Sequence, residues 1–307
     1  MAISRLPSDA FEPVHRGKVK EETFFRPSLT YWQDVRRRLK KNKMAMIGLF
    51  TIIIIVLVSI IGPVLAPYSY SEMDWSATNK PPSAKHWFGT DNLGRDLFVR
   101  VLYGARISLI VGIFASLINL TIGVIYGGIS GFVGGWLDNL MMRIVDILYG
   151  IPSLIYVILL MVILEPGLQN ILITLGVAYW LGMARIVRGQ ILTLKEQDYV
   201  LAARVIGVSW WRILLKHLIP NSMGPIIVTV TLSIPSAIFT EAFLSFIGLG
   251  VRAPMASWGV LASDGLSTLQ VYPFQLIIPA IAICITMLAF NFLGDGLRDA
   301  LDPRMRK

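Results

Sequence analysis

Six long stretches of mostly apolar sequence alternate with polar segments along the 307-residue chain. Because an α-helix rises 1.5 Å per residue, about 20 apolar residues are enough to cross the hydrocarbon core of a bilayer. The pattern therefore predicts an all-α, polytopic membrane protein with six transmembrane helices. The predicted spans cover residues 44–65, 107–137, 140–164, 170–184, 222–248 and 272–294.

The composition excludes a water-soluble enzyme and a disordered chain. Hydrophobic residues make up 55% of the sequence and charged residues 15%, with a mean hydropathy of +0.65. Soluble domains carry about 25% charged residues, and disordered chains combine low hydrophobicity with high net charge. The single Cys284, inside an apolar run, excludes a disulfide framework and a thiolate metal site, and the three histidines are too far apart to suggest a metal site.

The basic residues indicate the orientation in the membrane. The net charge is +9, and 22 of the 28 Lys and Arg residues fall on one side if the N-terminus is cytoplasmic. Because cytoplasmic segments carry the excess of Lys and Arg, both termini are predicted to be cytoplasmic. No DNA- or RNA-binding pattern accompanies the charge, so no nucleic-acid partner is expected.

These features divide the chain into five predicted parts. They are a basic cytoplasmic N-terminal segment (1–43), a first transmembrane helix (44–66), an extracytoplasmic loop (67–103), a larger transmembrane domain (104–300) and a cytoplasmic tail (301–307).

The inner loop at residues 190–220 is predicted to hold two short helices joined by a tight bend. Gly207 can adopt the left-handed conformation that ends the first helix. Ser209 is a candidate N-cap for a second helix at 210–218, and Pro220 is expected to stop it. Two interpretations fit these features: an amphipathic segment on the lipid surface, anchored by two adjacent tryptophans, or a docking element for a soluble partner.

Ala202, Ala203 and Gly207, followed after twelve residues by Pro220, form a pattern that resembles the cytoplasmic-loop signature of bacterial ABC importer permeases (Glu-Ala-Ala-x-x-x-Gly, nine residues, Ile-x-Leu-Pro). The chain departs from it at three positions, with Leu201 for Glu, His217 for Ile and Ile219 for Leu. The resemblance extends over nearly the whole chain and is strongest to the oligopeptide/dipeptide/nickel branch, in particular to second permease subunits of oligopeptide transporters. Further similar segments lie at 32–38, 88–96, 184–190 and 294–303.

The resemblance implies a type I ABC importer permease core at residues 104–300, in which the bent loop is the coupling helix that fits a cleft of an ATPase subunit. Ala202 and Ala203 would keep this helix thin, and Gly207 would permit the bend. Because Leu201 cannot form the salt bridge that a Glu could form here, the neighbouring arginines would serve instead. The coupling residues implied are Leu201, Ala202, Ala203, Arg204, Gly207, Ser209, Trp210, Arg212 and Pro220.

The resemblance further implies a non-catalytic subunit that forms half of the translocation path for oligopeptides. Its partners would be a homologous permease subunit, two cytosolic ABC ATPase subunits, an extracytoplasmic substrate-binding protein and the lipid bilayer of the bacterial cytoplasmic membrane. The chain itself would bind no cofactor, because the ATPase subunits use the ATP and magnesium. Dipeptides, nickel chelates and glutathione are alternative substrates, and an ion-gradient-driven secondary transporter is the rival class.

The segment from Gly89 to Gly94 has the G-x-x-x-x-G spacing of a phosphate-binding loop. However, Arg95 and Asp96 follow it, where nucleotide binding needs Lys and then Ser or Thr. We therefore expect no nucleotide site. The segment is either a turn-rich outer loop with a helix starting near Asp91, or a surface close to the substrate-delivering protein.

Gly123, Gly127, Gly131 and Gly135 recur every four residues in the second predicted span. On one helix they form a smooth strip that lets a second helix approach closely. The strip is expected to serve packing, with a hinge as the alternative.

Two acidic residues, Asp146 and Glu241, lie within predicted spans, where they are costly unless they are paired or face a cavity. Arg143 precedes Asp146 by about one helical turn, which predicts a local ion pair. Glu241 has no base nearby in the sequence, so it is expected to meet a base of a partner subunit or to face the translocation path. Interhelical hydrogen bonds are expected from Asn119, Tyr179 and Asn291.

Overall fold

The structure is a computed structural model that describes residues 30–302. Predictions for residues 1–29 and 303–307, which include most of the basic N-terminal segment and of the tail, lie outside the described residues. Within residues 30–302 the chain is helical, and its β-structure is limited to one isolated bridge between Thr90 and Asp96. The all-α prediction is confirmed.

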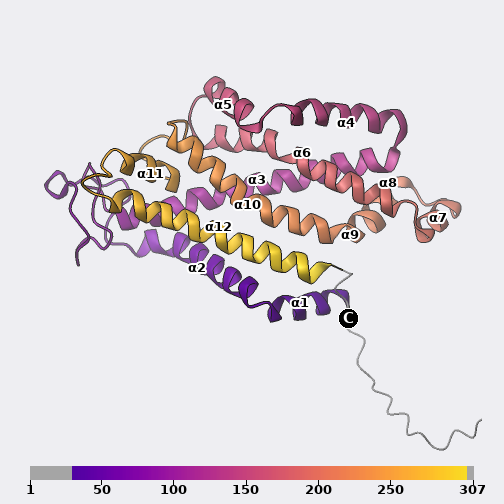
Figure 1. Cartoon of the computed structure of the whole chain (residues 1–307), viewed down its shortest axis with the longest axis horizontal. Coiled ribbons are helices and arrows are strands. Elements are labelled where there is room, and N and C mark those ends of the chain that lie inside the picture. Colours follow the sequence, from indigo (N-terminus) through magenta and orange to yellow (C-terminus); the bar gives the residue numbers. More distant parts are fainter. Residues whose placement is uncertain (1–29, 303–307) are drawn as a thin grey trace, which may run out of the picture.

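The helices have these bounds: α1 Tyr31–Lys41, α2 Lys43–Leu65, η1 Trp75–Ala77, α3 Leu97–Val133, α4 Gly135–Gly150, α5 Ser153–Leu164, α6 Leu168–Leu194, α7 Asp198–Val205, α8 Trp210–Ile213, η2 Leu214–Leu218, α9 Ile219–Asn221, α10 Met223–Phe246, α11 Trp258–Leu266 and α12 Phe274–Leu301. The long helices lie side by side along the long axis of the molecule (Figure 1). Helices α7 and α8 form one end, and α11 with the loop that precedes α3 forms the other.

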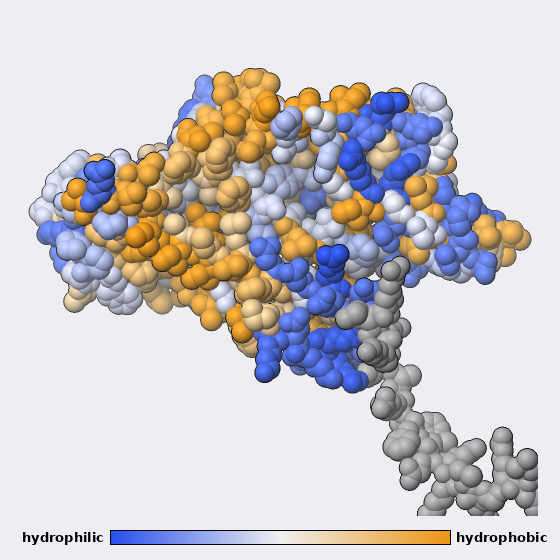
Figure 2. Space-filling view, in the orientation of Figure 1, coloured by the Kyte–Doolittle hydropathy of each residue, from blue (hydrophilic) through white to orange (hydrophobic). Residues whose placement is uncertain are grey.

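Five helices in the described part of the chain, α2, α3, α6, α10 and α12, are long and apolar enough to cross a membrane. Three of them extend well beyond their predicted spans: α3 begins at Leu97, α6 continues to Leu194 and α12 continues to Leu301. Apolar residues form a broad band over α2 and α12 and again over α5, whereas hydrophilic residues gather toward the end that carries α1 and α7 (Figure 2). The chain is a multi-pass membrane protein.

The predicted span at 140–164 is not one straight helix. It is a bent pair, α4 and α5, whose axes meet at 84°. The break falls at Ile151 and Pro152. Proline has no N–H to donate and disfavours helical geometry in the residue before it, so the helix ends there despite the continuous apolar sequence. The count of six spans holds when this pair is taken as one span.

The closest packing in the core joins α3 to α6. A Cβ atom on Gly123 would lie 2.5 Å from the Met183 side chain, and one on Gly127 would strike the backbone of Ala184. Gly131 likewise lies against α6. These three glycines confirm the predicted packing strip. The prediction is wrong for Gly135, because α3 ends at Val133 and no atom lies within 4 Å of the Cβ position of Gly135.

Candidate coupling site

The loop between α6 and α10 projects at one end of the molecule (Figure 1). Its first helix, α7, ends in a left-handed turn at Gly207, where φ is +76°. The Val208 N–H donates to the Ala203 carbonyl and the Gly207 N–H donates to the Arg204 carbonyl, both at 3.0 Å. This pair of bonds is the Schellman arrangement, in which a glycine closes a helix and satisfies its last carbonyl groups. The predicted bend at Gly207 is confirmed.

The second half of the loop differs from the prediction. Helix α8 is followed by a π-helical turn, η2, in which the Ile219 N–H donates to the Leu214 carbonyl five residues earlier. Pro220 does not stop the helix, because it lies inside α9. The wider π turn relieves the clash that the proline ring would otherwise make with the Lys216 carbonyl. Ser209 precedes α8 as expected, but its side chain makes no capping bond.

One side of the loop is anchored in the core. The anchoring side chains are fully buried or nearly so and pack against α6, α3 and α10: Val200, Ile213, Leu214 and Leu218. A second anchor is aromatic. The Trp210 ring stacks on the Phe132 ring with 5.9 Å between centroids. The Arg204 guanidinium lies 5.3 Å from the centre of the Phe132 ring. The loop is therefore held rigidly on the ends of the membrane helices.

The other side of the loop is exposed, and its tip is apolar. Val205 is 87% exposed and Ile206 is 79% exposed, and Leu201 lies on the same open side. Ala202 and Arg212 are exposed as well. Val205 and Ile206 are not among the coupling residues predicted from the sequence. The signal was present, since two apolar β-branched residues directly before a turn glycine have no reason to lie at a solvated tip unless another surface covers them.

Asp146 does not form the predicted local pair with Arg143. Its carboxylate lies 2.6 Å from Arg185 on α6, and that guanidinium also covers the Tyr149 ring at 4.1 Å from its centre. Helix α4 lies along α6, so a basic side chain of the neighbouring helix reaches the acid in place of the one on its own helix. A second pair of the same kind joins Asp138 to Arg188 at 2.6 Å.

Glu241 lines no path in this structure, because its side chain is fully buried inside the chain. Its carboxylate accepts hydrogen bonds from Ser108 at 3.0 Å and from Ser245 at 2.7 Å. Hydroxyl groups of its own chain, and not a base of a partner, therefore satisfy it. Neither predicted role for Glu241 is supported.

The expected interhelical bond of Tyr179 is confirmed. Its hydroxyl donates to the Ser236 carbonyl of α10 at 2.9 Å and lies 2.8 Å from the Thr240 hydroxyl. Asn119 is buried, but its side-chain oxygen has no partner within residues 30–302.

The segment from Gly89 to Gly94 is a turn that is held closed by hydrogen bonds and an ion pair of Asp91. The Asp91 carboxylate accepts from the Leu93 and Arg95 backbone N–H groups and pairs with the Arg95 side chain at 2.7 Å. Because these local bonds occupy Asp91, the helix begins later than predicted, at Leu97, with Asp96 as its N-cap. In a phosphate-binding loop the backbone N–H groups are free to bind a phosphate, whereas here the Asp91 carboxylate accepts hydrogen bonds from them.

This turn is tied to α11 and α12. Arg100, which pairs with Asp91, also lies 3.6 Å from Asp264 on α11. Burial raises the pKa of the Asp264 carboxyl group, an effect that the guanidinium groups of Arg100 and Arg95 partly offset. Gln275 of α12 donates to the Thr90 carbonyl at 2.8 Å. The outer loop is thereby fixed to the ends of the spans.

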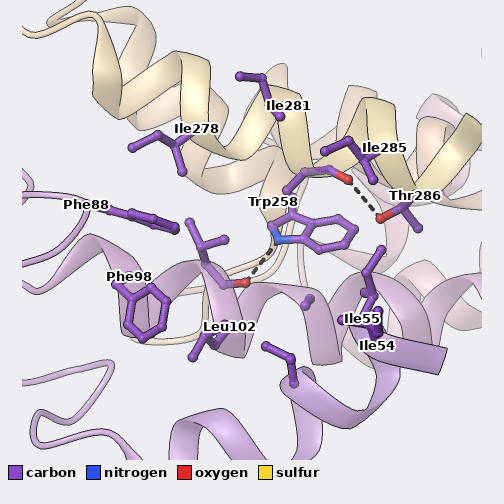
Figure 3. A pocket seen from close by; sticks show the side chains of 14 residues that line it. Ile54, Ile55, Phe88, Phe98, Leu102, Trp258, Ile278, Ile281, Ile285 and Thr286 are labelled. Atoms are coloured by element: carbon purple, nitrogen blue, oxygen red, sulfur yellow. Dashed lines mark hydrogen bonds between the residues drawn. The ribbon is translucent and has the colours of Figure 1, made fainter. Parts of the chain in front are cut away.

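An apolar groove of about 440 Å³ lies between α2, α3 and α12 on the same half of the molecule. Trp258 forms its floor and donates to the Val101 carbonyl at 3.0 Å (Figure 3). Thr286 is the one polar residue in its lining, and its hydroxyl donates to the Ala282 carbonyl. The groove offers a ligand no free polar group.

The described residues contain no group of three or more His, Cys, Asp or Glu side chains that could hold a metal ion. Cys284 is exposed on α12.

Five long spans, a bent pair and a rigid loop between α6 and α10 define the membrane subunit of a type I ABC importer. A solved structure described as inward-facing conformations of the MetNI methionine ABC transporter has the same fold, with a TM-score of 0.51 and 20% identity over 67% of this chain and 96% of that chain. Residues 98–307 match the family described as the binding-protein-dependent transport system inner membrane component, and the chain belongs to this family.

Residues 30–82 match a second description, the N-terminal TM domain of oligopeptide transport permease C. The chain is 53% identical to the oligopeptide transport system permease protein OppC of Bacillus subtilis (strain 168), over 99% of this chain and 100% of that protein. It is also 53% identical to the dipeptide transport system permease protein DppC of that organism, over 99% and 95% of the two chains. The OppC protein of Escherichia coli (strain K12) is 45% identical over 90% and 92%. The chain is a non-catalytic permease subunit, and the ATPase is a separate subunit.

Proposed function

We propose that this chain forms half of the translocation path of an ATP-driven importer of oligopeptides in the bacterial cytoplasmic membrane, with both termini in the cytoplasm. The substrate class is supported by the two Bacillus relatives, which are named for oligopeptide and dipeptide transport. Orientation is supported by the excess of Lys and Arg on the side that carries the α7–α8 loop.

The single observation that carries the coupling role is the apolar tip of this loop. Val205 and Ile206 are exposed beside the rigid turn at Gly207, and Leu201 takes the place of an acidic residue of the family signature. A loop tip that stays in water usually carries polar residues. The exposed apolar side chains at this tip therefore favour a partner surface that covers them, such as an apolar cleft of an ATPase subunit. Arg204 lies against the Phe132 ring of its own chain, so we assign the ionic contact to Arg212, which is also exposed.

The buried side of the loop connects the exposed tip to the membrane-spanning helices, so a movement of the ATPase subunits can be transmitted to these helices. When ATP binding draws the two ATPase subunits together, they push the exposed tip. Ile213 and Leu214, buried against α6, α3 and α10, carry that displacement to the spans. A peptide cannot cross hydrocarbon because its amide groups lose their hydrogen bonds to water there. A cavity that opens alternately to each side, enclosed with a homologous permease, removes this barrier.

The outer end of the chain suits the delivery of substrate. The loop before α3 is tied to α11 and α12 through Arg100, Asp264 and Gln275, so it presents a fixed surface. A substrate-binding protein that docks there would release its peptide into the cavity.

A variant with Val205→Asp and Ile206→Asp tests the coupling role. In membranes that contain the other subunits, we expect this permease to insert normally but to retain less than about a tenth of the bound ATPase, because two buried charges oppose docking. Val271→Asp, an exposed apolar residue at the opposite end, is the matched control and should leave ATPase binding intact. Normal ATPase binding by the double variant would support the lipid-surface interpretation of the loop instead.

Dipeptides are the second candidate substrate, because the relative named for dipeptide transport shows the same identity to this chain. Uptake of labelled peptides of graded length, in cells with and without the gene, distinguishes the two. Uptake confined to dipeptides would contradict the proposal for longer peptides.

A further inference from the structure

Helix α1 carries a strongly basic segment directly before the first membrane span. Residues 30–43 contain six Lys and Arg residues and a single acidic residue, Asp34. Asp34 pairs with Arg38 at 3.0 Å. The remaining basic residues form no ion pair within residues 30–302: Arg36, Arg37, Lys40, Lys41 and Lys43. The described part of the chain therefore leaves these charges without a counter-charge in contact.

The fold holds this basic segment in one place. Val35 is buried against the end of α12, and the Tyr31 hydroxyl donates to the Leu301 carbonyl at 3.2 Å. Asn42 ends α1 and begins α2, because it is the C-cap of the first helix and its side chain accepts from the Ala45 N–H at 3.1 Å. No flexible linker separates α1 from the span.

The basic side chains point away from the protein core. With 3.6 residues per helical turn, Arg37 and Lys40 lie on the side of α1 opposite the buried Val35, flanked by Arg36 and Lys41. All four basic residues are exposed. One face of α1 is therefore fastened to α12, and the other presents a fixed array of positive charges.

The apolar surface of α2 begins where the basic segment ends. Met44, Ile47 and Phe50, in the first turns of α2, are exposed. Hydrophilic residues over α1 lie directly beside the apolar band of α2 and α12 (Figure 2). A helix rises about 10 Å from residue 36 to residue 43, which is about one Debye length at 0.1 M salt. Even if α1 pointed straight away from the bilayer, its charges would lie within electrostatic reach of the headgroups around the start of α2.

Two features favour a membrane surface over a soluble acidic partner. Trp32 is exposed one turn before Arg36, and tryptophan is enriched at membrane–water interfaces. Helix α1 also lies beside the ends of α2 and α12, whereas the α7–α8 loop proposed for the ATPase projects from the molecule separately (Figure 1). Basic clusters next to a membrane span attract anionic lipids.

We propose that the exposed basic face of α1 binds the phosphate headgroups of anionic phospholipids, in the leaflet on the side of the α7–α8 loop. The lysine ammonium groups attract the phosphates, and each arginine can donate two parallel hydrogen bonds to one phosphate. Because α1 is fastened to α12 and continuous with α2, bound headgroups hold the neighbouring ends of both spans at the membrane surface. This contact is independent of the substrate that the transporter carries.

Lipid-selective fluorescence quenching tests the contact. A fluorescent amino acid replaces Met44 in the complete transporter, which is placed in nanodiscs with an equal mole fraction of brominated phosphatidylglycerol or brominated phosphatidylcholine. We expect phosphatidylglycerol to quench about threefold more efficiently at 0.1 M salt. The ratio should fall to about 1 at 1 M salt, where the Debye length is about 3 Å. Equal quenching by the two lipids at 0.1 M salt, or a ratio that salt leaves unchanged, would overturn the proposal.

Charge substitution provides the second test. Arg37→Gln with Lys41→Gln removes two bases from the exposed face of α1, and we expect the quenching ratio to fall by about half. Arg143→Gln with Lys216→Gln removes two exposed bases from other helices and should leave the ratio unchanged. A probe at Leu65, at the other end of α2, should be quenched equally in all variants if the span remains inserted.

Three results of this comparison would contradict the proposal. If the α1 variant keeps the full ratio, its bases only set the orientation of the chain. If both pairs of substitutions lower the ratio alike, the net charge and not α1 selects the lipid. If the α1 variant keeps the ratio but loses its ATPase subunits, the basic face belongs to the ATPase contact.

Discussion

Arg188 binds Asp138 through two parallel hydrogen bonds, both at 2.6 Å, across 50 positions of sequence. The Ser130 hydroxyl adds a third bond to the same carboxylate. This cluster fastens the start of α4 to α3 and α6. Paired bonds between a guanidinium and a carboxylate fix geometry as well as adding energy.

Asp138→Asn should therefore loosen α4. We expect a loss of about 1–3 kcal/mol in the free energy of unfolding, because Arg188 keeps its charge and loses its partner. Thermal unfolding of the purified permease measures the effect. Asp146→Asn is the matched control: its pair with Arg185 is exposed, so its loss should cost about 1 kcal/mol or less. Equal effects of the two variants would contradict this account of the cluster.

The α3–α6 contact gives a prediction about neighbouring glycines. Gly127→Ala places a methyl group against the Ala184 backbone and should destabilise the protein by about 1–3 kcal/mol. Gly128 is one residue away, and the nearest atom to its Cβ position is a Leu214 methyl carbon at 3.5 Å. Gly128→Ala should be neutral or stabilising by up to about 1 kcal/mol, because alanine is the better helix former. A denaturation series on both variants checks the contrast, and it fails if both lose stability alike.

The turn at Gly207 predicts graded effects on coupling. An L-residue in the left-handed region costs about 1–2 kcal/mol, and asparagine tolerates it better than β-branched residues do. Gly207→Val should uncouple transport, so that ATP hydrolysis no longer drives peptide uptake, whereas Gly207→Asn should retain most of it. Uptake and ATPase rates in proteoliposomes provide the measurement. Full coupling in the valine variant would show that the bend is dispensable.

Glu241 should tolerate an amide but not an apolar side chain. Glu241→Gln keeps an oxygen that accepts from one of the two hydroxyl groups of Ser108 and Ser245, and the other hydroxyl can rotate to accept from the amide NH2, so the stability should change by about 1 kcal/mol or less. Glu241→Leu leaves both buried hydroxyl groups without this partner, and we expect a loss of about 2–4 kcal/mol. The two melting temperatures, measured in the same detergent, would coincide if Glu241 were only a space filler.

Local signals in the sequence predicted the fold well. The apolar spans, the left-handed turn at Gly207 and the α3 packing strip depend on properties of one segment, and such properties can be seen in the residues themselves. The break at Pro152 could also have been found, since a proline in an apolar run is a local signal. Hydropathy alone conceals it because the sequence stays largely apolar on both sides of the proline, over residues 147–164.

The partners of the charged residues could not be predicted in the same way. The nearest base to Asp146 in sequence is Arg143, but its partner is Arg185, 39 residues away. Which of two arginines an acid meets depends on the rotation of α4 against α6, and no local pattern specifies that angle. Glu241 is similar, because its hydroxyl partners include Ser108, which is 133 positions distant.

Where Gly127 and Gly131 meet α6, the glycine backbone lies directly against the backbone of Ala184 and Arg188, whereas the Met183 side chain is the nearest neighbour of Gly123. Side chains can change rotamer and absorb a small displacement, but a peptide backbone inside a helix cannot. Over this stretch we expect α3 and α6 to move together as one rigid body. A displacement of their inner ends would therefore be transmitted directly to their outer ends, without intermediate side-chain rearrangements.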